Sequence, residues 1–173
     1  MKYISKLKEQ KEILDALFDK KEIYNKRYRK GGWTGKEVLI HIKDSETVSY
    51  DRLRRTISED SPVLWFFEQD LWQKNLNYMK QDITLAKKVF MLTRDSFFEA
   101  VEMHFEKFAN KKGVHSRRGL MSMKEQIEFH IWHIDKHIKH FFPFLSSRLT
   151  LAARSKLGHP RFRKHHRQLA VFM

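Results

Sequence analysis

The chain has 173 residues, 41% of them hydrophobic, and a formal net charge of +14, which suits a single domain with a substantial core. It contains no cysteine, so disulfide frameworks, thiolate zinc sites and cysteine nucleophiles are excluded. The N-terminus is charged throughout and no run approaches the roughly 18 apolar residues of a membrane span. We therefore expect a cytoplasmic protein with no membrane partner.

The first two predicted helices occupy the N-terminal third. Apolar residues recur at helical spacing over residues 2–28, which predicts the first helix. The second helix begins at Thr34 and Glu37, which have the form of a capping box, and extends to about Ile57. A long connection, residues 58–80, follows; because it is rich in aromatic residues, we expect it to pack over the bundle and to carry a short helix.

Two more helices follow the connection. The third is predicted over residues 82–108 with Asp82 as its cap, and the fourth opens with a second capping box, Ser122 and Glu125, and ends before Pro143. Four long helices with one long connection after the second indicate an all-α four-helix bundle with a crossover between helices 2 and 3. The short glycine-containing loops predict that helices 1 and 2, and helices 3 and 4, pack as antiparallel neighbours.

The C-terminal segment differs from the rest of the chain. From Arg148 onward it has seven Lys or Arg residues and no acid. We place the bundle domain at residues 1–145 and assign no role to the basic tail, residues 146–173, which can be an arm, a packed helix or a segment foreign to the domain. Elsewhere the positive charge is mixed with acids, which is typical of a solvated surface and less so of a nucleic-acid interface.

Histidines are concentrated on the predicted fourth helix, where His130, His133, His137 and His140 fall within eleven positions. His133 and His137 are four residues apart, so their nitrogens can converge on one ion. Two ligands do not make a firm site, and a third candidate, His41, lies on the second helix; bundle sites are built from facing helices. Spacing alone leaves open a surface histidine stripe and, for His41, a histidine of the core.

Three motifs in order resemble the DinB-like/YfiT superfamily of metalloproteins. Residues 32–46 contain a Trp, a helix start and a His-x-x-Asp element, and residues 54–72 are similar to the family's crossover. The pair formed by His133 and His137 matches the H-x-x-x-H motif on the family's last helix. The resemblance covers about residues 3–145.

The resemblance implies an up-down-down-up bundle that holds a divalent ion, often nickel or zinc. The ligands it implies are His41, His133 and His137. The chain departs from the family at Lys136, where a further histidine is common, and at His140, where a Gln is common. His140 and His130 are then expected to be polar groups near the site or plain surface residues.

The chemistry implied by the family has two branches. One is metal-dependent hydrolysis, and the other is transfer or isomerisation with a low-molecular-weight thiol such as bacillithiol or mycothiol. Either branch acts on a small-molecule substrate, and bundles of this kind often form homodimers. The rival interpretation is a non-enzymatic basic bundle that binds nucleic acid or another anionic partner.

Other residues near His41 are candidates for supporting roles. Asp44 lies one helical turn after His41 and can orient a ligand or accept a proton, which makes it the candidate catalytic residue. Glu46 and Arg52 are not tied to the ion by spacing. Aromatic residues can wall the pocket or belong to the core at the end of the bundle: Trp33, Trp65, Trp72 and Phe67.

Overall fold

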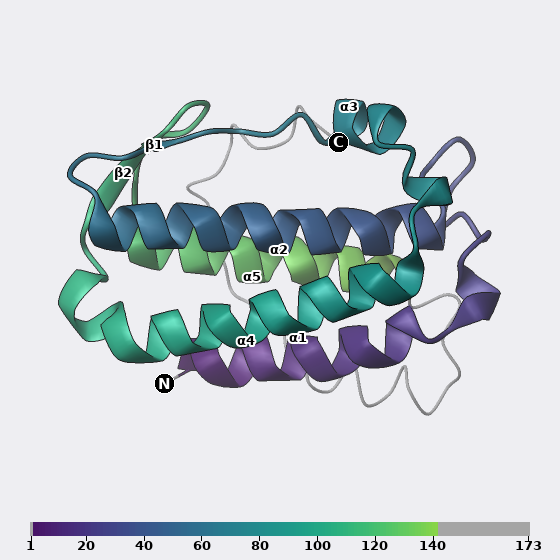
Figure 1. Ribbon diagram of the computed structural model, residues 1–173, viewed down its shortest axis with the longest axis horizontal. Helices are drawn as coiled ribbons and strands as arrows, with labels where there is room; N and C mark the ends of the chain where they lie inside the picture. The colour runs from purple at the N-terminus through teal and green to yellow at the C-terminus, as the bar shows by residue number, and fades with distance from the viewer. Residues whose placement is uncertain (1, 142–173) are drawn as a thin grey trace.

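The computed structural model describes residues 2–141, so the basic tail lies outside the described residues. Its four long helices are α1 (Lys2–Phe18), α2 (Gly35–Ser58), α4 (Ile83–Phe108) and α5 (Met123–Phe141). Helices α1 and α5 run one way along the bundle and α2 and α4 run the other way (Figure 1). The predicted up-down-down-up four-helix bundle is therefore confirmed. Within residues 2–141, no helix is both long and apolar enough to cross a membrane.

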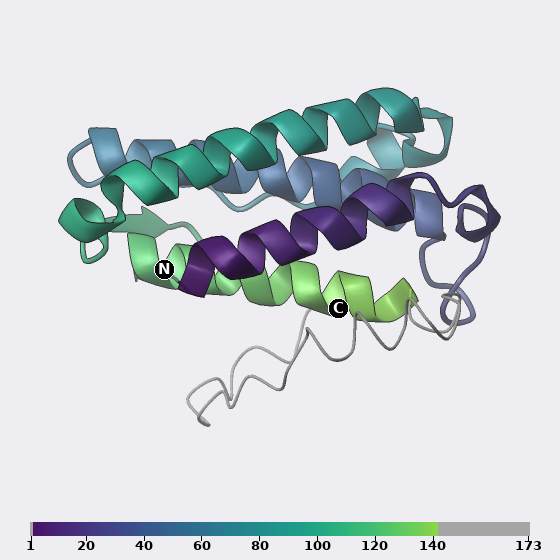
Figure 2. The same cartoon turned by 90° about the horizontal axis from the view of Figure 1, so that it is seen from below.

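The helices pack in a different order from the one predicted. Helix α2 packs mainly against α4 and α5, and α1 packs against the same two helices. Figures 1 and 2 together show that α1 and α2 lie at opposite corners of the bundle, and that α4 and α5 do so as well. The prediction that helices 1 and 2, and helices 3 and 4, pack as neighbours was wrong, because the connections at 19–34 and 109–122 are long enough to cross a diagonal.

The first helix is shorter than predicted and ends at Phe18, not at residue 28. Beyond it lies a short 3₁₀ helix, η1 (Lys21–Ile23), and the following backbone bonds to the start of α2: the Gly35 N–H donates to the Lys26 carbonyl at 2.9 Å. A Cβ at Gly35 would lie only 2.3 Å from the Ile23 carbonyl oxygen, so this close approach requires glycine. These bonds to α2 replace the helical bonds that would have continued α1.

All three predicted helix starts are confirmed. The Thr34 side chain accepts from the Glu37 N–H while the Glu37 carboxylate accepts from the Thr34 N–H. Ser122 and Glu125 form the same reciprocal pair at the start of α5. Asp82 caps α4 by accepting from two first-turn N–H groups. These caps fix where α2 and α5 begin and hence which residues face the interior.

A small sheet, which the sequence analysis did not predict, closes one end of the bundle. Its strands are β1 (Val63–Leu64), β2 (Lys112–His115) and β3 (Gly119–Ser122). Strand β1 of the crossover pairs parallel with β2, and β2 pairs antiparallel with β3 in a hairpin. The crossover also carries the expected short helix, α3 (Gln69–Asn75), and a 3₁₀ turn, η2 (Tyr78–Lys80).

The core consists of two apolar clusters separated by one layer of buried polar residues. Each long helix contributes to both clusters: α4, for example, places Phe90 in one and Phe97 in the other. Between them each helix contributes a polar side chain to one hydrogen-bonded group, and each of these side chains is at most 3% exposed. We call these four residues the polar layer: Gln10, Glu46, Arg94 and His130.

Candidate metal centre

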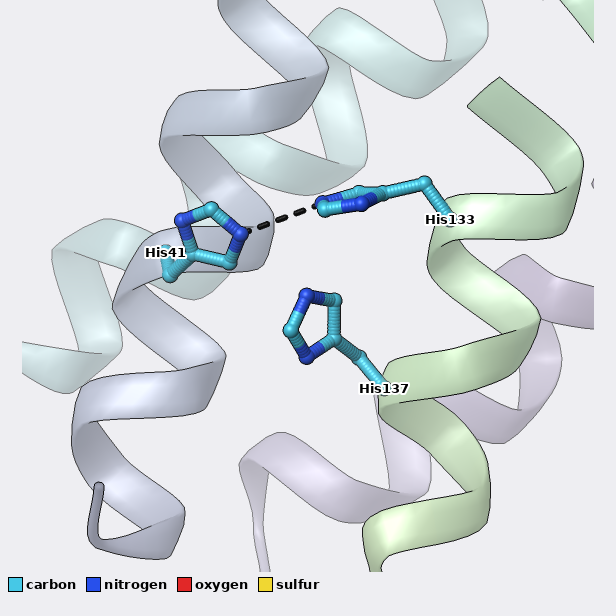
Figure 3. A group of neighbouring side chains, drawn as sticks. All are labelled: His41, His133 and His137. Atoms are coloured by element: carbon cyan, nitrogen blue, oxygen red, sulfur yellow. Dashed lines mark hydrogen bonds between the residues drawn. The ribbon is translucent and has the colours of Figure 1, made fainter. Parts of the chain in front are cut away.

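Three histidines from two facing helices converge on one point. His41 lies on α2, His133 and His137 lie on α5, and Figure 3 shows the three rings pointing toward one another. One nitrogen of each ring lies within 4.8 Å of the others, and the Nε2 atoms of His41 and His133 are 3.1 Å apart. Two nitrogens bound at about 2.1 Å to one ion lie about 3 Å apart, so the arrangement is close to that of a ligand set. We call it the histidine centre.

Local structure explains why these rings meet. The capping box starts α2 at Gly35, which places His41 in the second turn, fully buried on the side that packs against α5. The four-residue spacing places His133 and His137 one turn apart on α5. Their neighbours Ile134 and Ile138 are buried in the core, which leaves both rings half-buried at its edge.

Burial keeps these rings neutral. It lowers the pKa of His41 to about 3. Burial also lowers the pKa of His133 and of His137 well below 6.5, and repulsion from the other rings acts in the same direction. Apart from the three rings themselves, the only side-chain hydrogen-bonding group that the described residues place against the facing nitrogens is the Ser45 hydroxyl, 3.3 Å from Nε2 of both His41 and His133. Neutral imidazoles with free lone pairs are the form that binds metal.

The remaining ring nitrogens are held by packing, not by hydrogen bonds. Nδ1 of His41 and Nδ1 of His137 are buried and have no hydrogen-bond partner among the described residues. Metal-bound histidines usually donate this second N–H to an oxygen, which fixes the ring. Here Trp33 meets His41 edge-on at 5.2 Å and Phe67 stacks on it at 5.8 Å. Aromatic contacts therefore orient the His41 ring.

The structure brings some of the predicted pocket aromatics to the histidine centre and not others. Trp33 and Phe67 contact His41 directly, and Trp72 packs behind Phe67 with its ring centroid 4.9 Å away. Trp65 does not join this wall: its side chain is 72% exposed, and only its backbone carbonyl is engaged, as acceptor from Arg52.

Asp44, the predicted catalytic residue, is buried and lies three residues after His41, but its carboxylate faces other groups. Its carboxylate pairs with Lys43 and lies beside Tyr78, where it adds to the effect of burial and raises the pKa of the tyrosine further. Within the described part of the chain, no hydrogen bond or ion pair joins Asp44 to the three histidines. Its catalytic role stays a prediction.

The two extra histidines of α5 occupy different environments. His140 stacks on Tyr28 at 4.1 Å and meets His137 edge-on at 5.4 Å, so it lies beside the histidine centre. His130 instead belongs to the polar layer, where its Nε2 lies 2.8 Å from a Glu46 carboxylate oxygen. Its role is therefore tied to the bundle interior.

The sequence did not reveal the role of Arg94, which lies at the middle of the polar layer. The Arg94 guanidinium is fully buried and donates to Glu46 and to the Gln10 side chain. Burial alone would raise the pKa of Glu46, but Arg94 and His130 outweigh it and hold that pKa below its usual range. A signal was present, because Arg94 interrupts the apolar stripe between Phe90 and Phe97.

The fold and the histidine centre define a class: an up-down-down-up helical bundle with a three-histidine group between its second and last long helices. The family model of the DinB superfamily matches residues 7–141. The chain belongs to the DinB superfamily.

Curated relatives carry related descriptions. "Putative metal-dependent hydrolase OB0782" of Oceanobacillus iheyensis is 29% identical over 120 residues, which cover 65% of this chain and 65% of the relative. "Putative metal-dependent hydrolase OB0413" of the same organism is 26% identical over 140 residues, 79% of this chain and 77% of the relative. The chain thus spans just under two-thirds of the first of these proteins.

A solved structure shares the fold. YfiT from Bacillus subtilis, described as "a probable metal-dependent hydrolase with an unusual four-helix bundle topology", superposes with a TM-score of 0.74 at 19% identity. The match covers 87% of this chain and 85% of YfiT. It establishes the fold of the bundle, including the crossover topology.

Proposed function

We propose that this protein is a metal-dependent hydrolase whose divalent ion, nickel or zinc, is held by His41, His133 and His137. The observation that carries the proposal is the convergence of three neutral imidazoles on one point in the seam between α2 and α5. The curated relatives named as metal-dependent hydrolases support the choice of reaction class.

The donor set suits such an ion. Nitrogen ligands are preferred by zinc and nickel over magnesium or calcium, which bind mainly through oxygen. Three protein ligands leave coordination positions open, as in catalytic and not structural sites. The lowered pKa values of the rings keep the lone pairs available without competition from protons at neutral pH.

The chain's own residues would shape the reaction. A bound divalent ion supplies Lewis-acid chemistry to a water molecule or to a polar group of a small-molecule substrate. Trp33 and Phe67 cover the His41 side of the centre and exclude bulk water there. The Ser45 hydroxyl, between two ligand nitrogens, is the polar group best placed to hold a water molecule or a substrate oxygen.

Elemental analysis of purified, untagged protein tests the proposal. We expect about one nickel or zinc ion per chain in the wild type and in the control His104→Ala, whose histidine lies on α4. His133→Ala and His137→Ala are expected to lose the ion. Wild-type protein that contains no metal and takes up neither added nickel nor added zinc near neutral pH would overturn the proposal.

The same preparations then separate the two reaction branches. Metal-loaded protein is assayed against hydrolysable esters and amides, with and without an added low-molecular-weight thiol. Hydrolysis that needs the metal but no thiol supports a hydrolase. Consumption of substrate that occurs only with the thiol, and yields a thiol adduct, would assign the chain to the transferase branch.

A further inference from the structure

A second group of charged and polar side chains lies near the histidine centre, among the apolar side chains of Leu53, Phe97 and Met121. A small depression lies in the seam between α2 and α5, at the end closed by the sheet. The residues that line it include Ser49, Arg52, His115, Gln126 and Phe129. The depression is thus walled by both helices and by the β2–β3 hairpin, and none of its polar groups takes part in the metal site described above.

The depression lies one helical turn from the histidine centre. On α2, Ser49 comes four residues after Ser45, which contacts His41 and His133. On α5, Phe129 comes four residues before His133, and the two rings stack at 6.2 Å. Because α2 and α5 are antiparallel neighbours (Figure 1), both steps lead toward the sheet. Four helical residues correspond to about 6 Å along the axis.

Two arginines concentrate positive charge at this end of the seam: Arg52 lines the depression, and Arg118 lies next to it, between β2 and β3. The half-buried Arg52 donates to the Trp65 carbonyl through Nε at 3.1 Å, and the Arg118 guanidinium lies over the Phe129 ring at 4.1 Å. Within residues 2–141, neither guanidinium forms an ion pair with a carboxylate, whereas the adjacent Arg117 pairs with Glu68. Burial, and then repulsion by Arg118, lower the pKa of Arg52 to about 10. Asp51 acts on Arg52 in the opposite direction but forms no ion pair with it within residues 2–141, so the two guanidinium groups remain open to an anion.

His115 adds a neutral donor to the same depression. Its Nδ1 accepts the Arg117 backbone N–H at 3.2 Å, so the neutral ring carries its proton on Nε2. Burial lowers the pKa of His115 to about 4, and Arg52, Arg118 and Arg117 act in the same direction. The ring therefore stays neutral at pH 7 and can donate one hydrogen bond.

We propose that Arg52, Arg118 and His115 form an anion subsite that binds the acidic group of the substrate, a carboxylate or a phosphate. Guanidinium groups bind such planar or tetrahedral oxyanions through paired, charge-assisted hydrogen bonds. The assignment of this anion to a substrate rests on the proposed hydrolase function. Arg52 comes seven residues after Ser45 on α2, which corresponds to about 10 Å along the axis. The spacing then defines the substrate class: a small molecule with its acidic group about 10 Å from the bond that reacts at the histidine centre.

Anion binding is measured first in metal-free protein, so that the ion plays no part. Inorganic phosphate and succinate are titrated into wild type, Arg52→Gln, Arg118→Gln and the control Arg54→Gln, whose exposed side chain also lies on α2. The Nε–Hε NMR signals of Arg52 and Arg118 report binding. We expect saturable shifts in wild type and control, and affinity lower by about tenfold or more in each of the other variants. The tighter of the two probes identifies the acidic group.

The outcomes separate this inference from the proposed function. Shifts that do not saturate, or equal affinity in all four proteins, would overturn the anion subsite. Anion binding that occurs only after zinc is added, and survives in Arg118→Gln, would place the anion on the ion; it too would overturn the subsite while supporting the metal site. Arginine-dependent anion binding by a protein that, in the elemental analysis, neither contains nor takes up nickel or zinc would leave the subsite and remove the hydrolase. The exposed Arg118 keeps the test valid if Arg52→Gln fails to fold.

Discussion

Helix α5 contributes histidines to two groups that lie one turn apart, the polar layer and the histidine centre. The partners that surround the histidines differ between the two groups. In the polar layer, His130 faces the Glu46 carboxylate, which also accepts from Arg94. In the histidine centre, His133 faces the Nε2 of His41, and the described residues place no acid in contact with either ring. The first histidine has opposite charge beside it, whereas the second faces neutral groups, namely other histidines and the Ser45 hydroxyl.

This difference separates a group of residues that stabilises the fold from a group suited to binding a metal. A buried polar group is stable when a partner satisfies it, and the polar layer joins all four long helices through such partners. Three imidazoles that face one another cannot satisfy one another fully, because at most one proton fits between two nitrogens 3.1 Å apart. A bound cation would supply the missing partner. We therefore expect the polar layer to control stability and the histidine centre to control metal binding.

The largest expected effect is on stability and comes from Arg94→Met. The substitution leaves the Glu46 carboxylate buried without its arginine. Removing one partner of a buried ion pair lowers the free energy of unfolding by about 3–5 kcal/mol. Urea denaturation of the metal-free protein measures the loss. The matched control Lys87→Met, which removes exposed ion pairs on the same helix, should cost no more than about 1 kcal/mol.

The same variant tests whether the two groups are separable. Arg94→Met protein that remains folded should still bind metal, whereas His137→Ala should lose the metal. Equal and small stability losses for Arg94→Met and Lys87→Met would show that the polar layer does not hold the helices together. Loss of metal in folded Arg94→Met protein would show that the two groups act as one.

The pH dependence of stability is the next largest effect. The folded-state pKa of His41, about 3, lies below the 6.5 of an unperturbed histidine. The unfolded chain therefore binds a proton between pH 6.5 and 3 that the folded chain does not, and stability is lost as the pH falls through this window. For each such histidine the loss between pH 7 and 5.5 is about 1 kcal/mol, and His133 and His137 act in the same direction.

Urea denaturation at pH 7 and 5.5 in the presence of a chelator measures this dependence. His41→Asn is expected to reduce the difference between the two pH values by about 1 kcal/mol, whatever the variant does to absolute stability. The same pH dependence in wild type and His41→Asn would show that the His41 ring takes up a proton in the folded protein, contrary to the closed environment described here.

Features that depend on local sequence were predictable. Both capping boxes and the Asp82 cap involve residues within one helical turn, so they are visible in the sequence and the helix starts followed correctly. The pair of His133 and His137 also lies one turn apart. The addition of His41 from another helix needed the family resemblance, since spacing alone left its role open.

Features that depend on long-range contacts were not predictable in the same way. Helix α1 stops at Phe18 because the next backbone groups bond to the start of α2, which no local pattern records. Strand β1 has two residues and pairs with β2, about fifty positions away, so it shows no alternation of its own. The same pairing places the β2–β3 hairpin beside Arg52, and the anion subsite could not be assembled without it.

The smallest expected effect comes from Ser45→Ala and falls on the metal-free state of the histidine centre. In metal-free protein the Ser45 hydroxyl can donate to one Nε2 and accept from the other, since it lies 3.3 Å from both. A bound ion would occupy the lone pairs of both nitrogens, and the hydroxyl could no longer donate to either. Ser45→Ala should therefore lower metal-free stability by about 0.5–1 kcal/mol, the value of one neutral hydrogen bond.

Because this loss falls mainly on the metal-free state, Ser45→Ala should bind zinc about two- to fivefold more tightly than wild type. Competition with a chromophoric chelator measures the affinity, and Ser49→Ala, one turn along α2 and outside the histidine centre, serves as the control. A lower affinity in Ser45→Ala would mean that the hydroxyl supports the ion or its ligands in the loaded state. In that case Ser45 belongs to the metal site itself, and the comparison with the polar layer would have to include a fourth polar group at the histidine centre.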